Sequence, residues 1–399
     1  MTERHIRRAI IIGGGIAGPA VGMFLRRLGI EAVVCERRPT EALDEGLFLG
    51  VAPNGMHVLN ELGVRDRIDA VGVPCQGFEF RNARGDVIGA IDRQQDDARY
   101  GARLQMIRRC DLHRVLTSAA RQTGVQVQFG RSLVGLDQRD SSTAVAHFMN
   151  GGQERGDIVI GCDGIHSTAR LLTLPGAPGP TYSGLLDFGG FARCTVPIPT
   201  GVNVMVFGRR AFFGAFRTPA DEVWWFHNSG EKQDLVFPDR AAMRAHLPAL
   251  HQHEPAWIRE VIDSTETVAG PFPLNDILSM PRWYRGRVCL VGDAAHATTP
   301  SAGQGASLAL EDALVLAQCL RDIAPPERAF ATFERVRRPR VEAIVRQSRR
   351  NGSRKAVSGP IGEWIRDRLL PLFLRLGTKA QERQYAYQVA WPYRHGETA

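Results

Sequence analysis

Three acidic residues stand directly behind short apolar runs, and they are the side chains of this sequence best placed to bind a polar ligand. Glu36 follows residues 32–35, Asp163 follows residues 158–162, and Asp293 follows residues 288–292. Short β-branched apolar runs are typical of buried strands in a parallel sheet. Ligands bind at the carboxyl ends of such strands, so we expect the three carboxylates at the binding edge of a doubly wound sheet.

A Gly-x-Gly-x-x-Gly pattern between the first predicted strand and the first predicted helix indicates what that ligand is. Gly13, Gly15 and Gly18 follow an apolar run, and the helical pattern behind them ends at Gly29. The first glycine permits a tight turn, the second lets the backbone approach a pyrophosphate, and the third lets helix and strand pack closely. The helix N-terminus then offers unpaired N–H groups to the phosphates.

The acid at the end of the second strand fits the same interpretation. Glu36 lies 18 residues after Gly18, where a carboxylate can accept hydrogen bonds from both hydroxyls of an adenosine ribose and would repel a 2′-phosphate. We therefore predict dinucleotide binding. The alternative is that the glycines only form a tight turn.

The strand that ends at Asp293 leads into a second glycine-containing loop. Residues 300–306 read Pro-Ser-Ala-Gly-Gln-Gly-Ala, and a helical pattern follows them. His296 lies between Asp293 and this loop, and we interpret it as structural because a histidine after a strand usually satisfies backbone groups. Asp163 has an alternative too, since it could only cap the helix that starts near Ser167.

These elements, in this order, resemble the FAD-dependent aromatic hydroxylases, the group A flavoprotein monooxygenases typified by p-hydroxybenzoate hydroxylase. The match covers residues 10–18, Arg109 within residues 107–112, residues 157–170 and residues 287–313. Salicylate hydroxylases and tetracycline-inactivating monooxygenases look like the nearer relatives within this family, and the choice between the two is open. The resemblance implies FAD as the cofactor and NADH or NADPH as co-substrate, with the choice between the two nicotinamides open.

The resemblance also assigns roles to individual residues. It makes Glu36 the ribose ligand, Asp293 the partner of the ribityl chain, Arg109 a contact of the phosphate or ribityl region, and Asp163 with Gly164 a structural and nucleotide-binding pair. Residues 303–306 would present backbone N–H groups to the flavin pyrimidine edge, where reduction places negative charge. The predicted cofactor-binding residues are Gly13, Gly15, Ile16, Ala17, Gly18, Glu36, Arg37, Arg109, Leu133, Asp163, Gly164, Asp293, Pro300, Gly303, Gly305 and Ala306.

Between the second and third acidic strands the pattern changes to alternating strands with turns. Residues 191–196, 202–207, 211–217 and 223–227 predict an antiparallel sheet that is rich in aromatic side chains. We predict that four residues line a substrate pocket, although a place in the core is an equal alternative for each: Met205, Phe207, Phe216 and Trp225. We assign no catalytic side chain, because the flavin would carry the oxygen.

The predicted fold is mixed α/β, with a Rossmann-like FAD-binding domain, an inserted antiparallel-sheet substrate domain and a C-terminal helical segment. The FAD-binding domain takes residues 1–74, 100–177 and 278–330. The substrate domain takes residues 75–99 and 178–277, and the helical region takes residues 331–399. Only one glycine fingerprint is present, so the resemblance implies that the nicotinamide docks transiently over the flavin.

The predicted function is a monooxygenase that uses NAD(P)H and O2 to hydroxylate an aromatic or polyketide-like small molecule through a flavin C4a-hydroperoxide. One alternative is a reductase, dehydrogenase or halogenase-like tailoring enzyme of the same fold, although the WxWxIP signature of halogenases is absent. Another is a non-catalytic FAD-binding protein that is recruited to membranes by residues 335–355 and the apolar run at 369–376.

Bulk composition excludes several other classes. The net charge of +8 resides in residues 335–355, which hold nine basic side chains and one acid, and we interpret this segment as a solvated helix face with no nucleic-acid partner. Seven scattered cysteines indicate reduced thiols in a cytoplasmic protein. No apolar run is long enough to be a transmembrane segment. His251, His253 and Glu254 lack metal-ligand spacing, so no metal site is predicted. A monomer and a homodimer both remain open.

Overall fold

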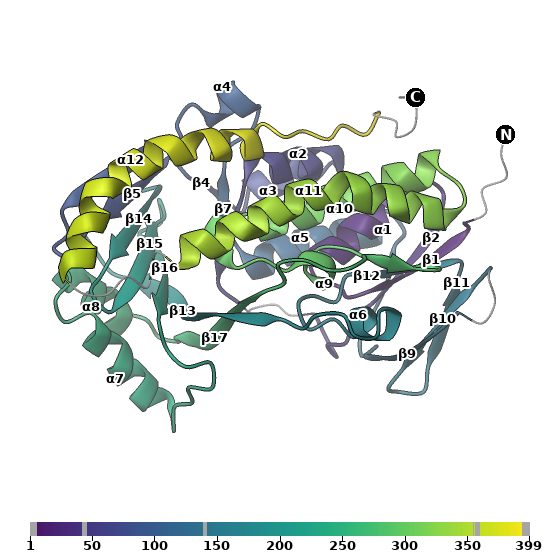
Figure 1. Ribbon diagram of the computed structural model, residues 1–399, viewed down its shortest axis with the longest axis horizontal. Helices are drawn as coiled ribbons and strands as arrows, with labels where there is room; N and C mark the ends of the chain where they lie inside the picture. Colours follow the sequence, from purple (N-terminus) through teal and green to yellow (C-terminus); the bar gives the residue numbers. More distant parts are fainter. Residues whose placement is uncertain (1–5, 42–45, 139–141, 354, 356–359, 393–399) are drawn as a thin grey trace.

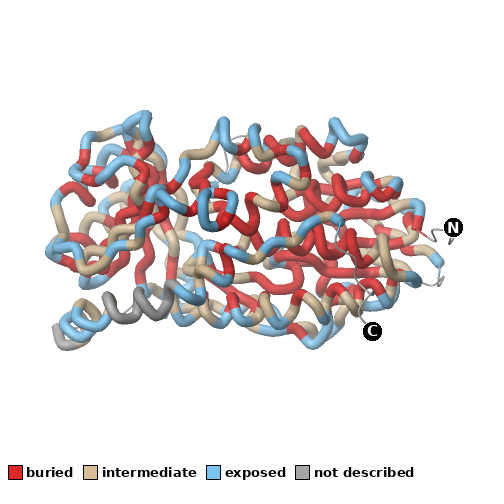
Figure 2. The backbone as a smooth tube through the Cα atoms, turned by 90° about the horizontal axis from the view of Figure 1, so that it is seen from above, coloured by how far each residue is buried: buried red, intermediate tan, exposed pale blue. Residues whose placement is uncertain are grey.

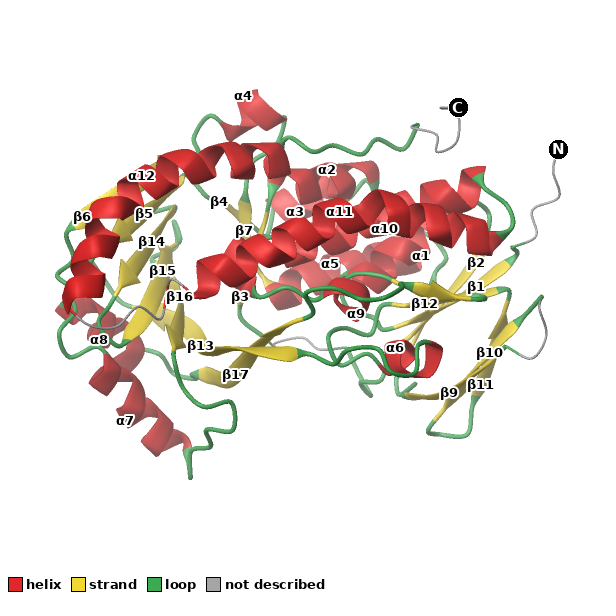
Figure 3. Ribbon diagram, viewed as in Figure 1, coloured by secondary structure: helices red, strands yellow, loops and turns green. Residues whose placement is uncertain are grey.

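A computed structural model describes residues 6–41, 46–138, 142–353, 355 and 360–392 of the chain. Its architecture confirms the predicted mixed α/β class (Figures 1 and 3). Buried residues form a large concentration around a six-stranded sheet and a smaller one around a seven-stranded sheet (Figure 2).

The six-stranded sheet is parallel except at one end. Its order is β18, β19, β12, β1, β2, β8, and only β18 runs antiparallel to its neighbour. The bounds in that order are Tyr284–Arg285, Val288–Leu290, Ile158–Gly161, Arg8–Ile12, Glu31–Cys35 and Gln126–Gln128. Strand β1, with the sequence RAIII, lies at the centre, where a continuous β-branched run suits a strand that is covered on both faces.

Helices cover one face of this sheet, and a small antiparallel sheet covers the other (Figure 1). The helices that pack over it are α1 (Ala17–Arg27), α5 (Arg109–Gln122), α10 (Gly305–Asp322), α11 (Pro326–Ser353) and α2 (Pro53–Glu61). Helix α1 ends as predicted, because Gly29 adopts a φ of +73° and its N–H bonds back to the carbonyl of Arg26. The small sheet contains β9 (Leu133–Asp137), β10 (Ala144–Phe148) and β11 (Gln153–Gly156).

The seven-stranded sheet forms the second part of the molecule. Its order is β17, β13, β16, β15, β14, β5, β6, and all neighbours are antiparallel except β14 and β5. The bounds in that order are Ala269–Asp276, Thr181–Arg193, Glu222–Ser229, Ala211–Arg217, Val202–Phe207, Gly77–Arg81 and Val87–Asp92. Helices α7 (Arg240–Leu250) and α8 (Ala256–Asp263) pack against one face, and α12 (Pro360–Tyr385) arches past the outer strands (Figure 1).

Short elements connect these layers. A three-stranded sheet of β3 (Phe48–Val51), β7 (Gln105–Arg108) and β4 (Val73–Pro74) lies between the two large sheets. The remaining helices are α3 (Arg65–Asp69), α4 (Asp96–Tyr100), α6 (Thr168–Thr173), α9 (Asp293–His296) and the 3-10 turn η1 (Pro300–Ala302). All seven cysteines are free thiols. None of the helices within the described residues combines the length and the apolar character that crossing a membrane requires.

The basic segment corrects one interpretation from the sequence. Most of it lies in α11, but it is not simply a solvated face, because Arg337 is fully buried and Arg349 pairs with the buried Asp276. The reason is that α11 packs on α10, where Glu311 and Asp312 form ion pairs with Arg337. The apolar run predicted at residues 369–376 belongs to α12, and its side chains from residue 371 onward lie outside the described ones.

Candidate functional site

The first glycine turn has the geometry that a phosphate-binding loop requires. Gly13 has a φ of +104°, and a Cβ there would lie 2.4 Å from the carbonyl oxygen of Cys162. A Cβ on Gly18 would lie 2.0 Å from the carbonyl oxygen of Gly13, whereas a Cβ on Gly15 would meet nothing within 4 Å. Gly13 and Gly18 are therefore required by packing inside the protein, and Gly15 faces open space where a ligand can approach the backbone.

The helix behind this turn leaves its N-terminus available. Ile16 and Ala17 begin α1, no side chain caps the helix, and no acid lies in its first turn. Ile16 is half-buried and Ala17 is buried. The free N–H groups and the dipole of α1 thus favour an anion at Gly15.

Glu36 lies beside the same turn at the end of β2. Its Oε2 accepts a hydrogen bond of 2.7 Å from the N–H of Gly14, its Oε1 accepts one of 3.0 Å from the N–H of Arg38, and the residue is 8% exposed. Each carboxylate oxygen can accept a further bond, so the oriented carboxylate fits a pair of ribose hydroxyls. The adjacent Arg37 is exposed, and Leu133 lies buried in β9 as part of the core.

Asp293 lies in a recess near Arg109. Its side chain is accessible to solvent, yet burial raises the pKa of Asp293 against the lowering effect of the charges on His296 and Arg109. A carboxyl group that is accessible but densely surrounded by protein must lie in a concave part of the surface. Arg109 is exposed at the start of α5, where its N–H donates to the carbonyl of Leu47. The pair can hold hydroxyl and phosphate groups of one extended ligand.

Asp163 caps a helix, as the alternative interpretation proposed. Its Oδ1 accepts from the hydroxyl of Ser167 and its Oδ2 accepts from the N–H of Ala169 at 2.9 Å, so both oxygens hold the start of α6. Burial raises the pKa of Asp163, although these hydrogen bonds oppose the change. Gly164 has a φ of +80° and open space at its Cβ position. A direct nucleotide contact by Asp163 stays a prediction.

The second glycine loop offers another helix N-terminus. Pro300 and Gly303 are exposed, Gly303 has a φ of +61°, and Gly305 and Ala306 open α10 without a side-chain cap. A Cβ on Gly303 would meet nothing within 4 Å. As at Gly15, backbone N–H groups at this N-terminus are accessible to a ligand.

Two residues near this loop were missed by the sequence interpretation. Gln304 is buried and its Oε1 accepts from Nδ2 of Asn54 at 3.0 Å, while its own Nε2 has no partner among the described residues. Nδ2 of Asn54 also donates to Oε1 of Glu311 at 2.6 Å. Buried donors without partners are rare, so the Gln304 amide fits a ligand acceptor. Asn54 carries no motif that could have identified it.

A buried ion network fixes the turn that carries Asp293. Asp312 of α10 accepts from the N–H of Gly292 at 3.0 Å and from Nε2 of His296 at 2.5 Å. Its other oxygen accepts from Nε of Arg337 at 2.7 Å, and Arg337 pairs with Glu311 at 2.6 Å. Burial alone would raise the pKa of Asp312, but the charges of His296 and Arg337 lower it to about 2. His296 therefore has the structural role that the sequence predicts.

Three of the four predicted pocket residues share one face of the seven-stranded sheet. Cross-strand partners lie on the same face, and the register pairs Met205 with Gly214, Phe207 with Phe212, and Phe216 with Trp224. This face is opposite to α7 and α8. Met205 is half-buried, Phe207 is 8% exposed, and Phe216 is fully buried in a small cluster.

Trp225 is a correction to the predicted pocket. It lies on the face that α7 and α8 cover, stacks on Phe213 with ring centroids 5.5 Å apart, and donates from Nε1 to the hydroxyl of Thr265 at 2.8 Å. Alternation along the strand places it on the face opposite to Met205, so it belongs to the core. Phe216, with no exposed surface, is likewise a packing residue in this structure.

Of the residues considered for metal binding, His251 belongs to that core, whereas His253 is exposed and Glu254 is half-buried. His251 is hydrogen-bonded to Nδ1 of His227 at 2.8 Å and lies near Glu254. Burial lowers the pKa of His227 well below its usual value, with a smaller contribution from the charge of His251. Within the described part of the chain, no group of three or more metal-ligating side chains is assembled.

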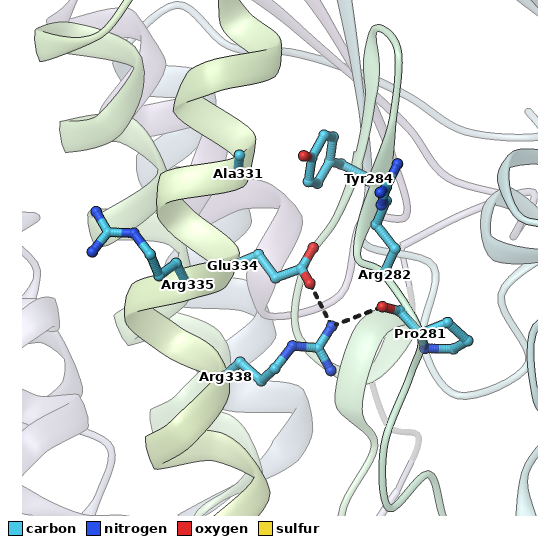
Figure 4. A pocket seen from close by; sticks show the side chains of 7 residues that line it. All are labelled: Pro281, Arg282, Tyr284, Ala331, Glu334, Arg335 and Arg338. Atoms are coloured by element: carbon cyan, nitrogen blue, oxygen red, sulfur yellow. Dashed lines mark hydrogen bonds and ion pairs between the residues drawn. The ribbon is translucent and has the colours of Figure 1, made fainter.

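A surface pocket on the outside of α11 lies apart from these residues. It is lined by Pro281, Arg282 and Tyr284 and by Ala331, Glu334, Arg335 and Arg338 of the helix (Figure 4). Arg338 pairs with Glu334 and donates to the carbonyl of Pro281. The pocket lies on the outer side of α11, and the charge of Glu334 is already paired with Arg338, so it is not part of the site.

Comparison with known proteins agrees with this geometry. A family model described as FAD binding domain matches residues 7–348. The 3-amino-4-hydroxybenzoate 2-monooxygenase of Streptomyces cremeus is 34% identical over 88% of each chain. The crystal structure of Klebsiella pneumoniae HpxO complexed with FAD and uric acid has a TM-score of 0.81 at 26% identity and covers 95% of this chain and 92% of that one. A salicylate hydroxylase substrate complex shares the fold, with a TM-score of 0.76 at 20% identity over 97% of this chain and 100% of that one.

Proposed function

Because the chain belongs to the FAD-binding domain family of FAD-dependent monooxygenases, we propose that it hydroxylates a small aromatic substrate with NAD(P)H and O2. When bound, FAD supplies the redox chemistry, taking electrons from the nicotinamide and activating O2. The protein supplies position and polarity: Gly15 and α1 receive the phosphates, Glu36 the ribose, and Asp293 with Arg109 the ribityl region.

The observation that supports this function best is the placement of the two glycine loops relative to the aromatic face of the seven-stranded sheet. A Cβ on Gly352, near the end of α11, would lie 3.3 Å from Oγ of Ser301 in the second glycine loop and 3.8 Å from Leu185 of β13. The end of α11 points toward this sheet (Figure 1). A flavin held by the loop therefore lies close to the face that carries Phe207, Phe212 and Phe226.

The relatives indicate the kind of substrate. The Streptomyces relative is named for an aminohydroxybenzoate and the Klebsiella structure contains uric acid, both small planar ring compounds. An aromatic lining stabilises such rings by stacking. We propose a single aromatic or heteroaromatic ring that carries a hydroxyl or amino group.

The test is to supply candidate aromatic compounds to the holoenzyme with NADH or NADPH under 18O2. We expect one class of compounds to accelerate nicotinamide oxidation and to yield a product that contains one 18O atom by mass spectrometry. Nicotinamide oxidation that forms H2O2 without labelled product for every compound would instead support a reductase or oxidase.

Replacement of Asp293 by Asn is expected to weaken FAD binding roughly 10- to 100-fold, since a hydrogen bond to a charged group contributes about 1.5–3 kcal/mol. The stability of the cofactor-free protein should change little, because Asp293 makes no helix cap there. The measurements are FAD titration by flavin fluorescence and urea unfolding of the cofactor-free protein.

Asp163→Asn is the matched control for Asp293→Asn. Asn has one acceptor oxygen where Asp163 uses two, so one of the two hydrogen bonds at the start of α6 is lost. Stability should fall by about 0.5–1.5 kcal/mol, and FAD affinity should change less. The assignment of Asp293 fails if both variants retain FAD as the unchanged protein does.

A further inference from the structure

A polar cluster of three residues lies on the aromatic face of the seven-stranded sheet. Asp187 of β13 and Asn228 of β16 are cross-strand partners, and Nδ2 of Asn228 donates to Oδ1 of Asp187 at 2.6 Å. Nζ of Lys355, which follows α11, donates to Oδ1 of Asn228 at 2.7 Å. The ammonium and the carboxylate are thus joined through the amide and do not pair directly.

Aromatic rings surround the ammonium group. Nζ of Lys355 lies 4.4 Å from the ring centroid of Phe212 and 5.4 Å from that of Phe226. Phe212 is also the cross-strand partner of Asn228, and Phe207 is the partner of Phe212. A cation over two ring faces is stabilised where water is partly excluded. The cluster therefore combines a flat apolar wall with one positive charge.

The two charged members line a recess. Asp187 and Lys355 both keep some solvent-accessible surface. Burial nevertheless raises the pKa of Asp187 to about 7, although the Lys355 charge acts to lower it. Burial also lowers the pKa of Lys355 to about 8, although the Asp187 charge acts to raise it. On the neighbouring strand β17, the partner of Asp187 is the apolar Phe272. Groups that are accessible and yet surrounded by protein face a concavity.

This recess lies close to the second glycine loop. Gly352, three residues before Lys355, borders both Ser301 and Leu185, and Nδ2 of Asn351 donates to the carbonyl of Ser301 at 3.3 Å. Leu185 precedes Asp187 by two residues, roughly 7 Å along the strand. The cluster is thus beside the place proposed for the flavin.

We propose that Lys355 binds the carboxylate of an aromatic acid substrate, while Asn228 and Asp187 hold the ammonium in position. This inference rests on the proposed function and specifies its substrate class. An ammonium group has three N–H donors, and Asn228 receives one of them. The half-buried ring of Phe226 provides the surface against which the ring of the acid stacks, and the buried Phe212 supports it from behind.

Charge balance gives the proposal a pH dependence. Without substrate, Asp187 neutralises Lys355. A bound carboxylate adds a second negative charge, so the complex is most stable when Asp187 takes up a proton from solvent. Since the pKa of Asp187 is about 7, affinity for the acid should be highest below pH 7 and should fall by up to about tenfold per pH unit above it. Loss of the Lys355 proton, whose pKa is about 8, should add to the fall at higher pH.

The experiment measures binding to the FAD-loaded protein through the change in flavin absorbance. The probes are benzoate, 4-hydroxybenzoate and 3-amino-4-hydroxybenzoate, each compared with its carboxamide. We expect at least one acid to bind roughly 10- to 100-fold more tightly than its amide, and Lys355→Met to abolish that preference while amide binding stays unchanged. Arg350→Met, which removes an exposed charge from α11, should keep the preference.

Asp187→Asn provides a second readout that does not depend on the Lys355 variant. This neutral side chain imitates protonated Asp187, so the variant should still prefer the acid to its amide at about pH 6.5. It also removes the charge that raises the pKa of Lys355, so the pH dependence that remains in the variant should be that of the Lys355 ammonium. The proposal is overturned if no acid binds better than its amide to the unchanged protein, or if Lys355→Met retains the preference.

These outcomes are separable from the test of the proposed function. Acids that bind through Lys355 but receive no 18O would contradict the hydroxylation and leave the binding site intact. Hydroxylation of neutral aromatic compounds with no preference for acids would contradict the binding site and leave the monooxygenase function intact.

Discussion

Replacement of Arg337 by Met should lower the free energy of unfolding by about 3–5 kcal/mol, because it leaves buried carboxylates without their counter-charge. Arg337 has no exposed surface and bridges Glu311 and Asp312. Asp312 holds the N–H of Gly292 and the ring of His296, so the loss should also disturb the turn that carries Asp293. The measurement is urea unfolding at a fixed FAD concentration, since the cofactor stabilises the folded state.

Arg335→Met on the same helix is the matched control for Arg337→Met. Arg335 is exposed, so its loss should change stability by no more than about 0.5 kcal/mol. An Arg337 variant that unfolds at the same urea concentration as the control would show that the network contributes nothing to stability. Asp312→Asn, which removes a carboxylate that pairs with Arg337, should also lower the free energy of unfolding.

Exchange of two glycines of the first turn for alanine should separate folding from cofactor binding. Gly18→Ala places a Cβ 2.0 Å from a backbone oxygen, so α1 must move away from the sheet, at a cost of about 3 kcal/mol or more. Gly15→Ala adds a Cβ where nothing lies within 4 Å, so the protein should fold normally. That Cβ occupies the approach of the pyrophosphate and should weaken FAD binding roughly 10- to 100-fold.

Urea unfolding of the cofactor-free proteins and FAD titration of the Gly15 variant are the two measurements for this pair. Retention of full FAD affinity by Gly15→Ala would place the pyrophosphate elsewhere. An unchanged stability of Gly18→Ala would mean that the helix can shift without loss of packing.

Local sequence was sufficient to predict an element where the residues that form it lie within one short segment. The glycine spacing at Gly13, Gly15 and Gly18 produced the expected strand, turn and helix, because the tight turn and the close packing depend on glycines within six consecutive residues. Strands β14 and β15 were predicted with their observed bounds, since turn residues limit both of them. Alternation along a strand could not show which face the helices cover, so the sequence left Trp225 open between pocket and core.

Tertiary structure decided everything that depends on which elements meet. Trp225 became a core residue because α7 and α8 pack on its face, and Arg337 became buried because α10 presents two acids to α11. Asn54 is hydrogen-bonded to Gln304, 250 residues away in the sequence, and Lys355 is hydrogen-bonded to Asn228, 127 residues away. The sequence by itself determined the family motifs and strands β14 and β15, which follow from local pattern and turn geometry. It predicted a strand at 191–196, where the structure has β13 at Thr181–Arg193. The partners of each buried charge were determined only by the packing of distant segments, because burial and pairing are properties of the assembled fold.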